Sequence, residues 1–409
     1  MDAGRLNIVK FELDNFGKKL DLIDFVANID IYESIFESYI SATVSILDGA
    51  GLLDRITWAG SKITLSYTTS DKIDPVTFNF LVDGVTHSSP NEMQKAQTYV
   101  VTMYSEEVLR GLAIRVNEIF TKQQPETMIT NILRNKLKTN KRFVAAKTGA
   151  LDTINCANLR PFQAINKIQK RAVSRDKASS SFVFFENQHG YRFVSVEELL
   201  SDVRNDPQVK LGDRNFYLDG IKHKGINDTS WRQILSIEKT KLQSLTDTII
   251  SGGIKKQIYA YNVSTGEYYK FEYDDAKNAS MFDVNPRSIT YKKVATQEII
   301  KTGDDTAGLN VIPIVSNDEL ERVKKEIYVQ AFISKISSNI IRMETHGDSR
   351  MTVGTGVNLN LPIIDGTTEN KVSELASGVY LVSKLHHIII PSNQLYSQSY
   401  ELIRTGMFE

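Results

Sequence analysis

Acidic and histidine side chains are the groups of this chain that could act as acid–base catalysts or hold a metal ion. Glu344, His346 and Asp348 alternate along a predicted strand, so they would share one face of it, as a metal or acid–base cluster requires. Three ligands of one ion rarely come from a single strand, and we therefore interpret these residues as a solvated face near a turn. The other histidines form no HExxH or similar metal-binding spacing: His87, His189, His223, His386 and His387.

Other candidate motifs lack residues that their chemistry needs. His386 and His387 are adjacent, so on a strand they point to opposite faces, and we assign them to packing at an edge or in a barrel wall. Residues 354–356, Gly-Thr-Gly, resemble part of a phosphate loop without its third glycine or its Lys-Ser/Thr, and a hairpin is predicted there. Cys156 has no histidine nearby in the sequence, which predicts a small buried side chain. The sequence predicts no catalytic, cofactor-binding or metal site.

Two basic segments, residues 134–142 and 167–175, could contact phosphate groups. Both are assigned to amphipathic helices, whose outer faces are normally charged, and neither contains aromatic residues for base stacking. We interpret them as solvated or protein-facing surfaces. A tyrosine-rich hairpin is predicted to be either an interface anchor or a plain two-sided hairpin; its tyrosines are Tyr259, Tyr261, Tyr268 and Tyr269.

Composition limits the class of protein. A chain of 409 residues exceeds one ordinary core, and domains of roughly 100–200 residues predict two to four of them. The 41% hydrophobic and 24% charged residues are typical of globular proteins. Lys and Arg number 49, as do Asp and Glu, and this balance argues against a dedicated nucleic-acid binder. The single cysteine excludes an intrachain disulfide and suits a reducing cytoplasm.

No signal peptide or membrane-spanning segment is expected. The N-terminus alternates like a strand and lacks the basic-then-apolar layout of a signal peptide. No apolar run approaches the roughly 18–20 residues that span a bilayer. We therefore expect a soluble protein that no cleavable signal exports.

The first hundred residues have β-branched and alternating runs, which predict a small antiparallel barrel or sandwich. A glycine-bearing helical turn is predicted at residues 48–54. The predicted strands are residues 22–28, 35–47, 61–69, 76–85 and 98–104.

From residue 105 the pattern becomes helical. Pro125 and Pro161 each fit the first position of an amphipathic helix. A strand at 182–185, a turn at 186–190 and a return strand at 191–194 then predict a tight hairpin, followed by a short helix. The apolar positions of the two helices are Ile129, Ile132, Leu133 and Leu137, and Ile165, Ile168 and Ala172.

Strand patterns return near Phe216 and continue to the end of the chain, with residues 274–308 predicted to be mostly loop. A helix is predicted to begin after Asn317 or Asp318 as N-cap, with Leu320, Val323, Ile327 and Ala331 as its apolar stripe. The predicted strands are residues 234–243, 254–262, 267–273, 340–346, 356–361, 378–390 and 397–404.

The predicted fold is therefore α+β and β-rich. We predict two antiparallel barrels, residues 1–104 and residues 206–250 with 317–409. Between them lie an α+β module at 105–205 and a hairpin insertion at 251–316. Direct self-similarity between the two β-rich regions is too weak to assign a repeat, so a duplicated barrel is a hypothesis.

The order of these elements resembles the baseplate central hub protein of contractile-tailed bacteriophages, the T-even-like hub. It also resembles, more distantly, the hub part of type VI secretion spike proteins. The resemblance covers essentially the whole chain. It rests on the helix from Pro161 to Ala172 with FVFFENQHGYRFVSVEELL, on residues 251–254 leading into YAYNVSTGEYYKFEYDD, on SGVYLVSKLHHIII with YSQSYELIRTG, and on DGAGLLD near the N-terminus.

The resemblance implies two related tail-tube-like barrels per chain and a ring-shaped homotrimer. Six quasi-equivalent positions would then join a three-fold spike below to a six-fold tail tube or tube-initiator ring above. The channel would hold the tape-measure protein and DNA without sequence-specific binding. Neighbouring baseplate proteins are further implied partners, in a virion tail assembled in the bacterial cytoplasm. No lysozyme or peptidase segment is recognised, so lytic activity would lie in another chain.

The sequence therefore predicts a structural assembly protein without catalysis and without a cofactor. The alternatives are the hub of a related contractile or type VI-like machine, a metal-dependent enzyme using residues 344–348, and a DNA-binding module using the two basic segments.

Overall fold

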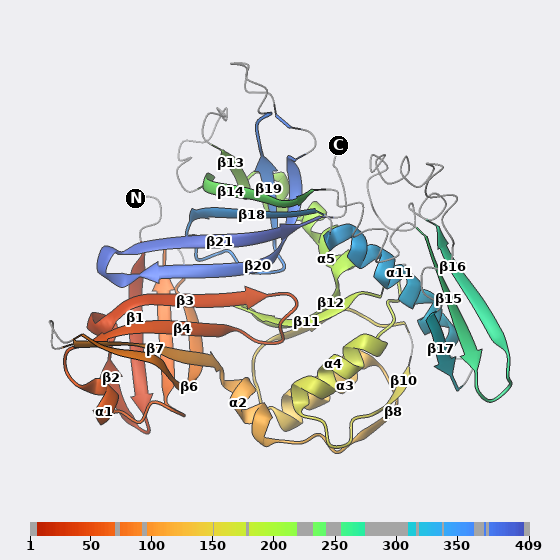
Figure 1. Cartoon of the computed structure of the whole chain (residues 1–409), viewed down its shortest axis with the longest axis horizontal. Coiled ribbons are helices and arrows are strands. Elements are labelled where there is room, and N and C mark those ends of the chain that lie inside the picture. The colour runs from red at the N-terminus through yellow and green to blue at the C-terminus, as the bar shows by residue number, and fades with distance from the viewer. Residues whose placement is uncertain are drawn as a thin grey trace.

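A computed structural model describes residues 6–69, 74–91, 96–149, 151–176, 180–218, 232–242, 255–274, 310–315, 319–337, 339–363, 372–373 and 376–404. One thirteen-stranded sheet runs through the molecule (Figure 1), in the order β19-β13-β14-β18-β21-β20-β3-β4-β7-β6-β5-β1-β2. The predicted residues 251–253, Asn317, Asp318, His223 and most of 274–308 lie outside the described part.

The N-terminal half of this sheet is strongly curled and follows the predicted strands with three corrections. The predicted strand 22–28 begins only at Val26, because residues 23–25 form a short 3-10 helix. The predicted strand 35–47 begins only at residue 41, because residues 35–40 form a turn, and the strand before it runs on to residue 34. Ile35 and Ile40 are buried in that turn, so they continue the apolar alternation of the flanking strands. The elements are β1 (Asn7–Asn15), β2 (Lys18–Asp21), β3 (Val26–Ser34), β4 (Ser41–Asp48), α1 (Leu52–Arg55), β5 (Lys62–Thr68), β6 (Val76–Asn91) and β7 (Ala96–Ser105).

The C-terminal half closes into a six-stranded barrel, because β19 pairs with both β13 and β20. The predicted hairpin at residues 354–356 is wrong: β18 pairs with β14 and β21, whereas β19 pairs with β13 and β20. Residues 347–355 are instead a loop between two strands that are not neighbours. The strands are β13 (Asn215–Leu218), β14 (Gln233–Leu242), β18 (Asn339–His346), β19 (Gly356–Asn360), β20 (Gly378–Ile390) and β21 (Leu395–Ile403).

The two halves share one backbone ladder, since β20 pairs with β3 from Lys384↔Ser34 to Ile389↔Ile29. Figure 1 shows these strands side by side in the middle of the molecule. The N-terminal half of the large sheet, β1 to β7, is called the first sheet below. The far end of the β20–β21 hairpin lies in its core, where Ile389 and Tyr396 are fully buried.

The same strand arrangement occurs twice. The antiparallel order β3-β4-β7-β6-β5 recurs as β14-β18-β21-β20-β19, with the strands in the same order along the chain. Two register shifts recur at matching places: between Val26 and Asn28 in β3 as between Ile234 and Ser236 in β14, and directly after Val82 in β6 as after Val382 in β20.

Backbone hydrogen bonds repeat as well. Gly60 N donates to the Val82 carbonyl at 2.9 Å, and Gly354 N donates to the Val382 carbonyl at 3.0 Å. Both glycines have a positive φ, 83° and 79°, a backbone conformation in which a residue with a side chain would be strained. Gly354 therefore serves a repeated long-range contact and not a hairpin turn. The duplication hypothesis is supported by registers and hydrogen bonds that the sequence does not reveal.

An α+β module lies below the sheet in Figure 1. All six residues of β11 are buried, because the β11–β12 hairpin contributes to two cores: Val183 and Phe185 pack into the barrel, and Phe182 and Phe184 into the module. Its turn is tighter than predicted, since Asn187 pairs with Gly190. The elements are α2 (Glu106–Ala113), β8 (Ile119–Gln123), α3 (Pro125–Asn131), β9 (Phe143–Ala145), β10 (Asp152–Asn155), α4 (Pro161–Arg171), β11 (Phe182–Asn187), β12 (Gly190–Ser195), α5 (Val196–Asn205) and α6 (Pro207–Lys210).

The tyrosine-rich hairpin forms a small sheet with β17, in the order β16-β15-β17, and packs against the helix α11. Val323, Ile327 and Ala331 of α11 are buried, as their spacing predicted. The elements are β15 (Lys255–Asn262), β16 (Tyr268–Asp274), β17 (Asn310–Ile314) and α11 (Leu320–Ser337). No helix in the described ranges has both the length and the apolar character to cross a membrane.

Candidate functional site: a buried polar junction

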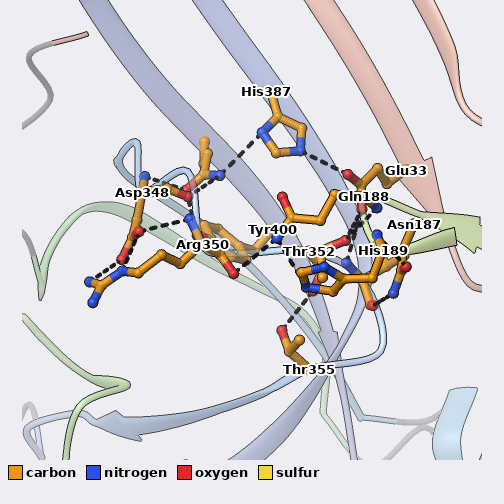
Figure 2. A network of polar contacts seen from close by, with 12 residues as sticks. Glu33, Asn187, Gln188, His189, Asp348, Arg350, Thr352, Thr355, His387 and Tyr400 are labelled. Carbon is orange, nitrogen blue, oxygen red and sulfur yellow. Dashed lines mark hydrogen bonds and ion pairs between the residues drawn. The ribbon is translucent and has the colours of Figure 1, made fainter. Parts of the chain in front are cut away.

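Polar side chains gather where the first sheet, the barrel and the α+β module meet (Figure 2). Glu33 comes from the end of β3, and His387 lies on β20. The loop 347–355 and the turn of the β11–β12 hairpin complete the cluster. The three parts of the chain are therefore joined by hydrogen bonds as well as by apolar contact.

Glu33 links the first sheet to the barrel loop. Its side chain has no exposed surface, and its Oε2 accepts hydrogen bonds from the Thr352 hydroxyl and from Val353 N, the latter at 3.1 Å. The other oxygen, Oε1, lies 3.4 Å from Nε2 of the fully buried His387. Neither of these two atoms has a hydrogen-bond partner among the described residues. Because Oε2 accepts from two residues of the loop 347–355, this buried carboxylate fixes the loop against β3.

His387 begins a chain of buried polar contacts on the barrel side. Its Nδ1 lies 2.6 Å from the hydroxyl of Tyr396, and Gln398 Nε2 donates to the same hydroxyl at 2.7 Å. Gln398 also receives a hydrogen bond from Asp348 N at 2.9 Å and donates to the Asp348 carbonyl at 3.1 Å. Burial raises the pKa of the Tyr396 hydroxyl well above its usual value, so it stays a neutral hydrogen-bonding group.

Asp348 anchors the outer end of the loop. Burial alone would raise the pKa of its carboxyl, but hydrogen bonds and charge from Arg350, with a smaller contribution from Arg232, hold the pKa below its usual value. Arg350 donates to this carboxylate through Nε at 2.9 Å and through Nη2 at 2.7 Å. This bidentate contact fixes the orientation of the carboxylate. Asp348 is therefore ionised, and its carboxylate is paired with Arg350.

The module reaches the same loop through the turn between β11 and β12. Asn187 Nδ2 donates to the Val353 carbonyl at 3.3 Å, and Gln188 Nε2 donates to the Arg350 carbonyl at 3.3 Å. His189 lies beside them, and burial lowers the pKa of its imidazole. Loop 347–355 is thus held from two sides.

Gly347 shows how tightly the junction is packed. A Cβ at this position would lie 2.0 Å from the ring of Tyr396, which is itself fully buried. Gly347 N also donates to the Tyr396 carbonyl at 2.8 Å. The loop therefore approaches β21 more closely than any residue with a side chain could.

The structure separates the candidate residues 344, 346 and 348. Glu344 is exposed and His346 half-buried on β18, whereas Asp348 lies beyond the strand end and is buried by its arginine contacts. No group of three metal-ligating side chains occurs among the residues that the structure describes. The interpretation as a strand face is correct for Glu344 and His346, and wrong for Asp348.

The adjacent histidines do face opposite ways. His386 is partly exposed, contacts Asp30 at 2.8 Å and stacks on Tyr32 with ring centres 4.4 Å apart, while His387 is wholly buried. Both lie inside the sheet, which confirms the barrel-wall alternative over the edge. Cys156 is fully buried, as predicted, and burial raises the pKa of its thiol.

The basic segments extend past their helices, since the helical part of the first ends at residue 136 and that of the second at Arg171. Lys141, in the first segment, lies inside a buried ion cluster. Its Nζ is 2.6 Å from Glu186 Oε1 and 2.7 Å from Glu107 Oε2. Glu186 Oε2 also accepts from Ile40 N at 3.3 Å, which ties the module to the turn after β3.

This ion cluster was not predicted from the sequence, because its members are far apart along the chain and sit in unrelated motifs. Burial alone would lower the pKa of Lys141, but the charges of Glu186 and Glu107 raise this pKa above its usual value. Burial raises the pKa of Glu186. Lys141 therefore stays charged and holds two carboxylates that are only 4% and 3% exposed.

The tyrosine-rich hairpin remains open to either interpretation. Tyr261 and Tyr268 lie with ring centres 4.7 Å apart, and Tyr268 is 67% exposed. The Tyr269 hydroxyl donates to Glu267 at 2.6 Å.

Comparison with known proteins identifies the fold. No protein-family model matches the sequence, and no curated protein matches it. The tail protein from Neisseria meningitidis MC58 is similar with a TM-score of 0.59 at 9% identity, over 97% of this chain and 97% of that one. The 43 kDa tail protein of prophage MuSo2 from Shewanella oneidensis gives a TM-score of 0.55 at 11% identity, over 97% and 98%. The chain therefore has the fold of these tail proteins, which confirms at the level of the fold the resemblance that its sequence predicted.

Proposed function

We propose that this chain is the structural hub of a phage tail baseplate, in which three copies form a ring around a central channel. The repeated strand arrangement is the observation that carries this proposal, because the large sheet of each chain holds two similar sets of strands, joined side by side by β20 and β3. Three copies bring six such units to one ring. A ring with three-fold symmetry and six similar units can contact a three-fold partner on one face and a six-fold partner on the other.

The proposed partners follow from this symmetry. A three-fold spike protein would bind below, and the six-fold tail tube or a tube-initiator ring above, with neighbouring baseplate proteins outside. The channel would hold the tape-measure protein and later DNA, without sequence-specific contacts. A formal net charge of zero supports passage without tight binding of a polyanion. The location would be the virion tail, after assembly in the bacterial cytoplasm.

We further propose that residues 1–104 and residues 206–250 with 317–409 are the two tube-like units. Residues 105–205 would form the module that braces them, and 251–316 an insertion. The chain would have no catalytic role of its own. In support, the buried groups of the junction contact one another and loop backbone, and the Tyr396 hydroxyl stays neutral.

Light scattering on the purified chain tests the ring. We expect a particle of three times the 46.1 kDa chain mass, either for the protein alone or after addition of its spike protein. A stable particle of two copies would contradict the proposal, as would a single chain that stays single when the spike is added.

A further inference from the structure

A polar pocket of about 490 Å³ opens beside the loop 347–355. Its walls come from the start of β6, the turn between β11 and β12, the stretch from α6 to β13, the residue before β14 and the loop itself. Arginines and aspartates both line it: Arg214, Arg232, Arg350, Asp74, Asp213 and Asp348. Segments that are distant along the chain therefore bring several charged groups to one hollow.

Two of these arginines are already paired with carboxylates. Arg350 holds Asp348 in the bidentate contact described above, and Arg214 Nη1 donates to Asp206 Oδ2 at 2.8 Å. Arg232 is different, because its Nη2 lies 3.7 Å from Asp348 Oδ2, too far for a hydrogen bond, and Arg350 already donates to that oxygen. The carboxylate closest to pairing with Arg232 thus serves another arginine.

Arg232 is also mostly buried and incompletely bonded. Its side chain is 12% exposed, its guanidinium lies over the Phe216 ring at 5.3 Å, and its buried Nη1 has no hydrogen-bond partner among the described residues. Burial lowers the pKa of this guanidinium, yet an arginine in a protein stays protonated at neutral pH. Buried arginines are almost always paired, so the environment of Arg232 lacks an anionic acceptor.

A second residue of the pocket wall has an unpartnered polar atom. Gln188, labelled with Arg350 in Figure 2, donates through Nε2 to the Arg350 carbonyl, but its buried Oε1 accepts no hydrogen bond from the described residues. The pocket therefore lacks an acceptor for Arg232 and a donor for Gln188. A water molecule could form either hydrogen bond, but it brings no charge to balance the guanidinium.

We propose that this pocket binds inorganic phosphate. The phosphate oxygens would accept from Arg232 Nη1, and the proton that inorganic phosphate keeps at neutral pH would donate to Gln188 Oε1. Asp74 and Asp213 also line the pocket, but both are exposed, so water and salt screen their charges. The site lies within one chain and goes beyond the proposed ring.

A bound phosphate would join parts of the chain that meet at the pocket. Arg232 lies directly before β14, and Gln188 lies in the turn of the β11–β12 hairpin, which belongs to the α+β module. A ligand that binds the folded state and not the unfolded chain raises the stability of the protein in proportion to the logarithm of its concentration. Phosphate should therefore raise the melting temperature of this protein.

Calorimetric titration of the full chain with inorganic phosphate, in chloride buffer of matched ionic strength, tests the site. The native chain should bind a single phosphate, and Arg232→Met should weaken this binding roughly 10- to 100-fold, the effect of losing a charge-assisted hydrogen bond. Sulfate has the same shape but no proton at neutral pH. It should bind several-fold more weakly, because it leaves Gln188 Oε1 without a donor.

Two further variants support the titration. Gln208→Glu places a carboxylate at an exposed position of the pocket wall, so it should weaken phosphate binding by repulsion without disturbing a buried residue. Arg342→Met removes an exposed arginine of β18 that pairs with Glu401 outside the pocket, and phosphate should bind to it as to the native chain.

Melting temperatures separate a phosphate ligand from a merely structural arginine. Without phosphate, Arg232→Met should melt no lower than the native chain, because it removes an unpaired buried N–H and leaves Asp348 paired with Arg350. With phosphate, only chains that keep Arg232 should gain stability. A clearly lower melting temperature of Arg232→Met in phosphate-free buffer would show that the fold itself uses this guanidinium, and would contradict the proposal.

The other outcomes are equally direct. A native chain that gives neither heat nor a melting shift with phosphate would overturn the site, as would equal binding by Arg232→Met and Arg342→Met. Equal affinity for sulfate would overturn the assignment of the ligand to phosphate. None of these results depends on the number of copies in the particle, so light scattering tests the proposed ring separately.

Discussion

Replacing Lys141 by methionine is expected to lower the free energy of unfolding by about 3–5 kcal/mol at neutral pH, the usual cost of removing one partner from a buried ion cluster. The ammonium group contacts Glu186 and Glu107 at 2.6 and 2.7 Å, and both carboxylates are almost fully buried. Without Lys141 two almost fully buried like charges would lie close together. Urea unfolding followed by tryptophan fluorescence measures the change.

The pH dependence of this variant gives a second readout. With Lys141 removed, the two glutamates would hold protons in the folded state at a pH where the unfolded chain has lost them. The folded state then binds more protons, so the stability of the variant should rise as the pH falls from 7 towards 5. In the native protein the raised pKa of Lys141 keeps the contribution of the lysine fully present below its usual value of 10.5, and this contribution is lost as the pH rises through the raised value. The pKa of Glu107 is lowered, so its contribution is lost as the pH falls through that value.

Two variants control for side effects. Lys136→Met removes a lysine of the same segment that pairs with Glu118 near the surface, and it should cost at most about 1 kcal/mol. Adding Glu186→Gln to Lys141→Met should recover part of the loss, because one buried charge remains instead of two. Equal losses for Lys136→Met and Lys141→Met would show that the cluster has no special role.

Replacing Glu33 by alanine is expected to cost about 3 kcal/mol. The Thr352 hydroxyl and Val353 N would lose their acceptor in a region with no access to water, and each buried unsatisfied group costs about 1–3 kcal/mol. The loop 347–355 would also lose its attachment to β3. Urea unfolding should show the loss, and hydrogen exchange should show faster exchange of the Val353 amide.

Two further substitutions sharpen this test. Glu37→Ala removes an exposed glutamate four residues away and should change stability by less than about 0.5 kcal/mol. Glu33→Gln keeps one acceptor oxygen and should fall between the two. If Glu33→Ala matched Glu37→Ala, Glu33 would not be what holds the loop to the first sheet.

Local patterns predicted most elements of the fold. Pro125 and Pro161 do begin helices, and the apolar positions assigned to those helices are buried. The turn at residues 35–40 was missed because Ile35 and Ile40 are buried and continue the alternation of the strands on either side, so that strand periodicity predicts a strand through the turn.

The junction could not be predicted, because its contacts join residues that are distant along the chain. Glu33 and Thr352 are 319 positions apart, and Lys141 and Glu186 are 45 apart. No spacing rule covers such pairs. Only FVFFEN carried a signal: a strand without polar alternation indicates burial on both faces, as found for β11 between two cores.

The duplication is likewise absent from the residue types. Thr43 of β4 corresponds to Arg342 of β18, and Lys62 of β5 to Gly356 of β19. What the two halves share is register, the positions of the bulges and the glycine-to-valine backbone contacts. The repeat is therefore visible in the backbone geometry and not in the residue types.

Electron micrographs of the purified protein, with and without its spike, measure the symmetry of the particle directly. Averaged views down the axis should present an annulus with three-fold symmetry, six similar lobes and an open centre. Averages that show an isolated globule, or a particle with a two-fold axis, would contradict the idea that this fold is duplicated in order to match one symmetry to another.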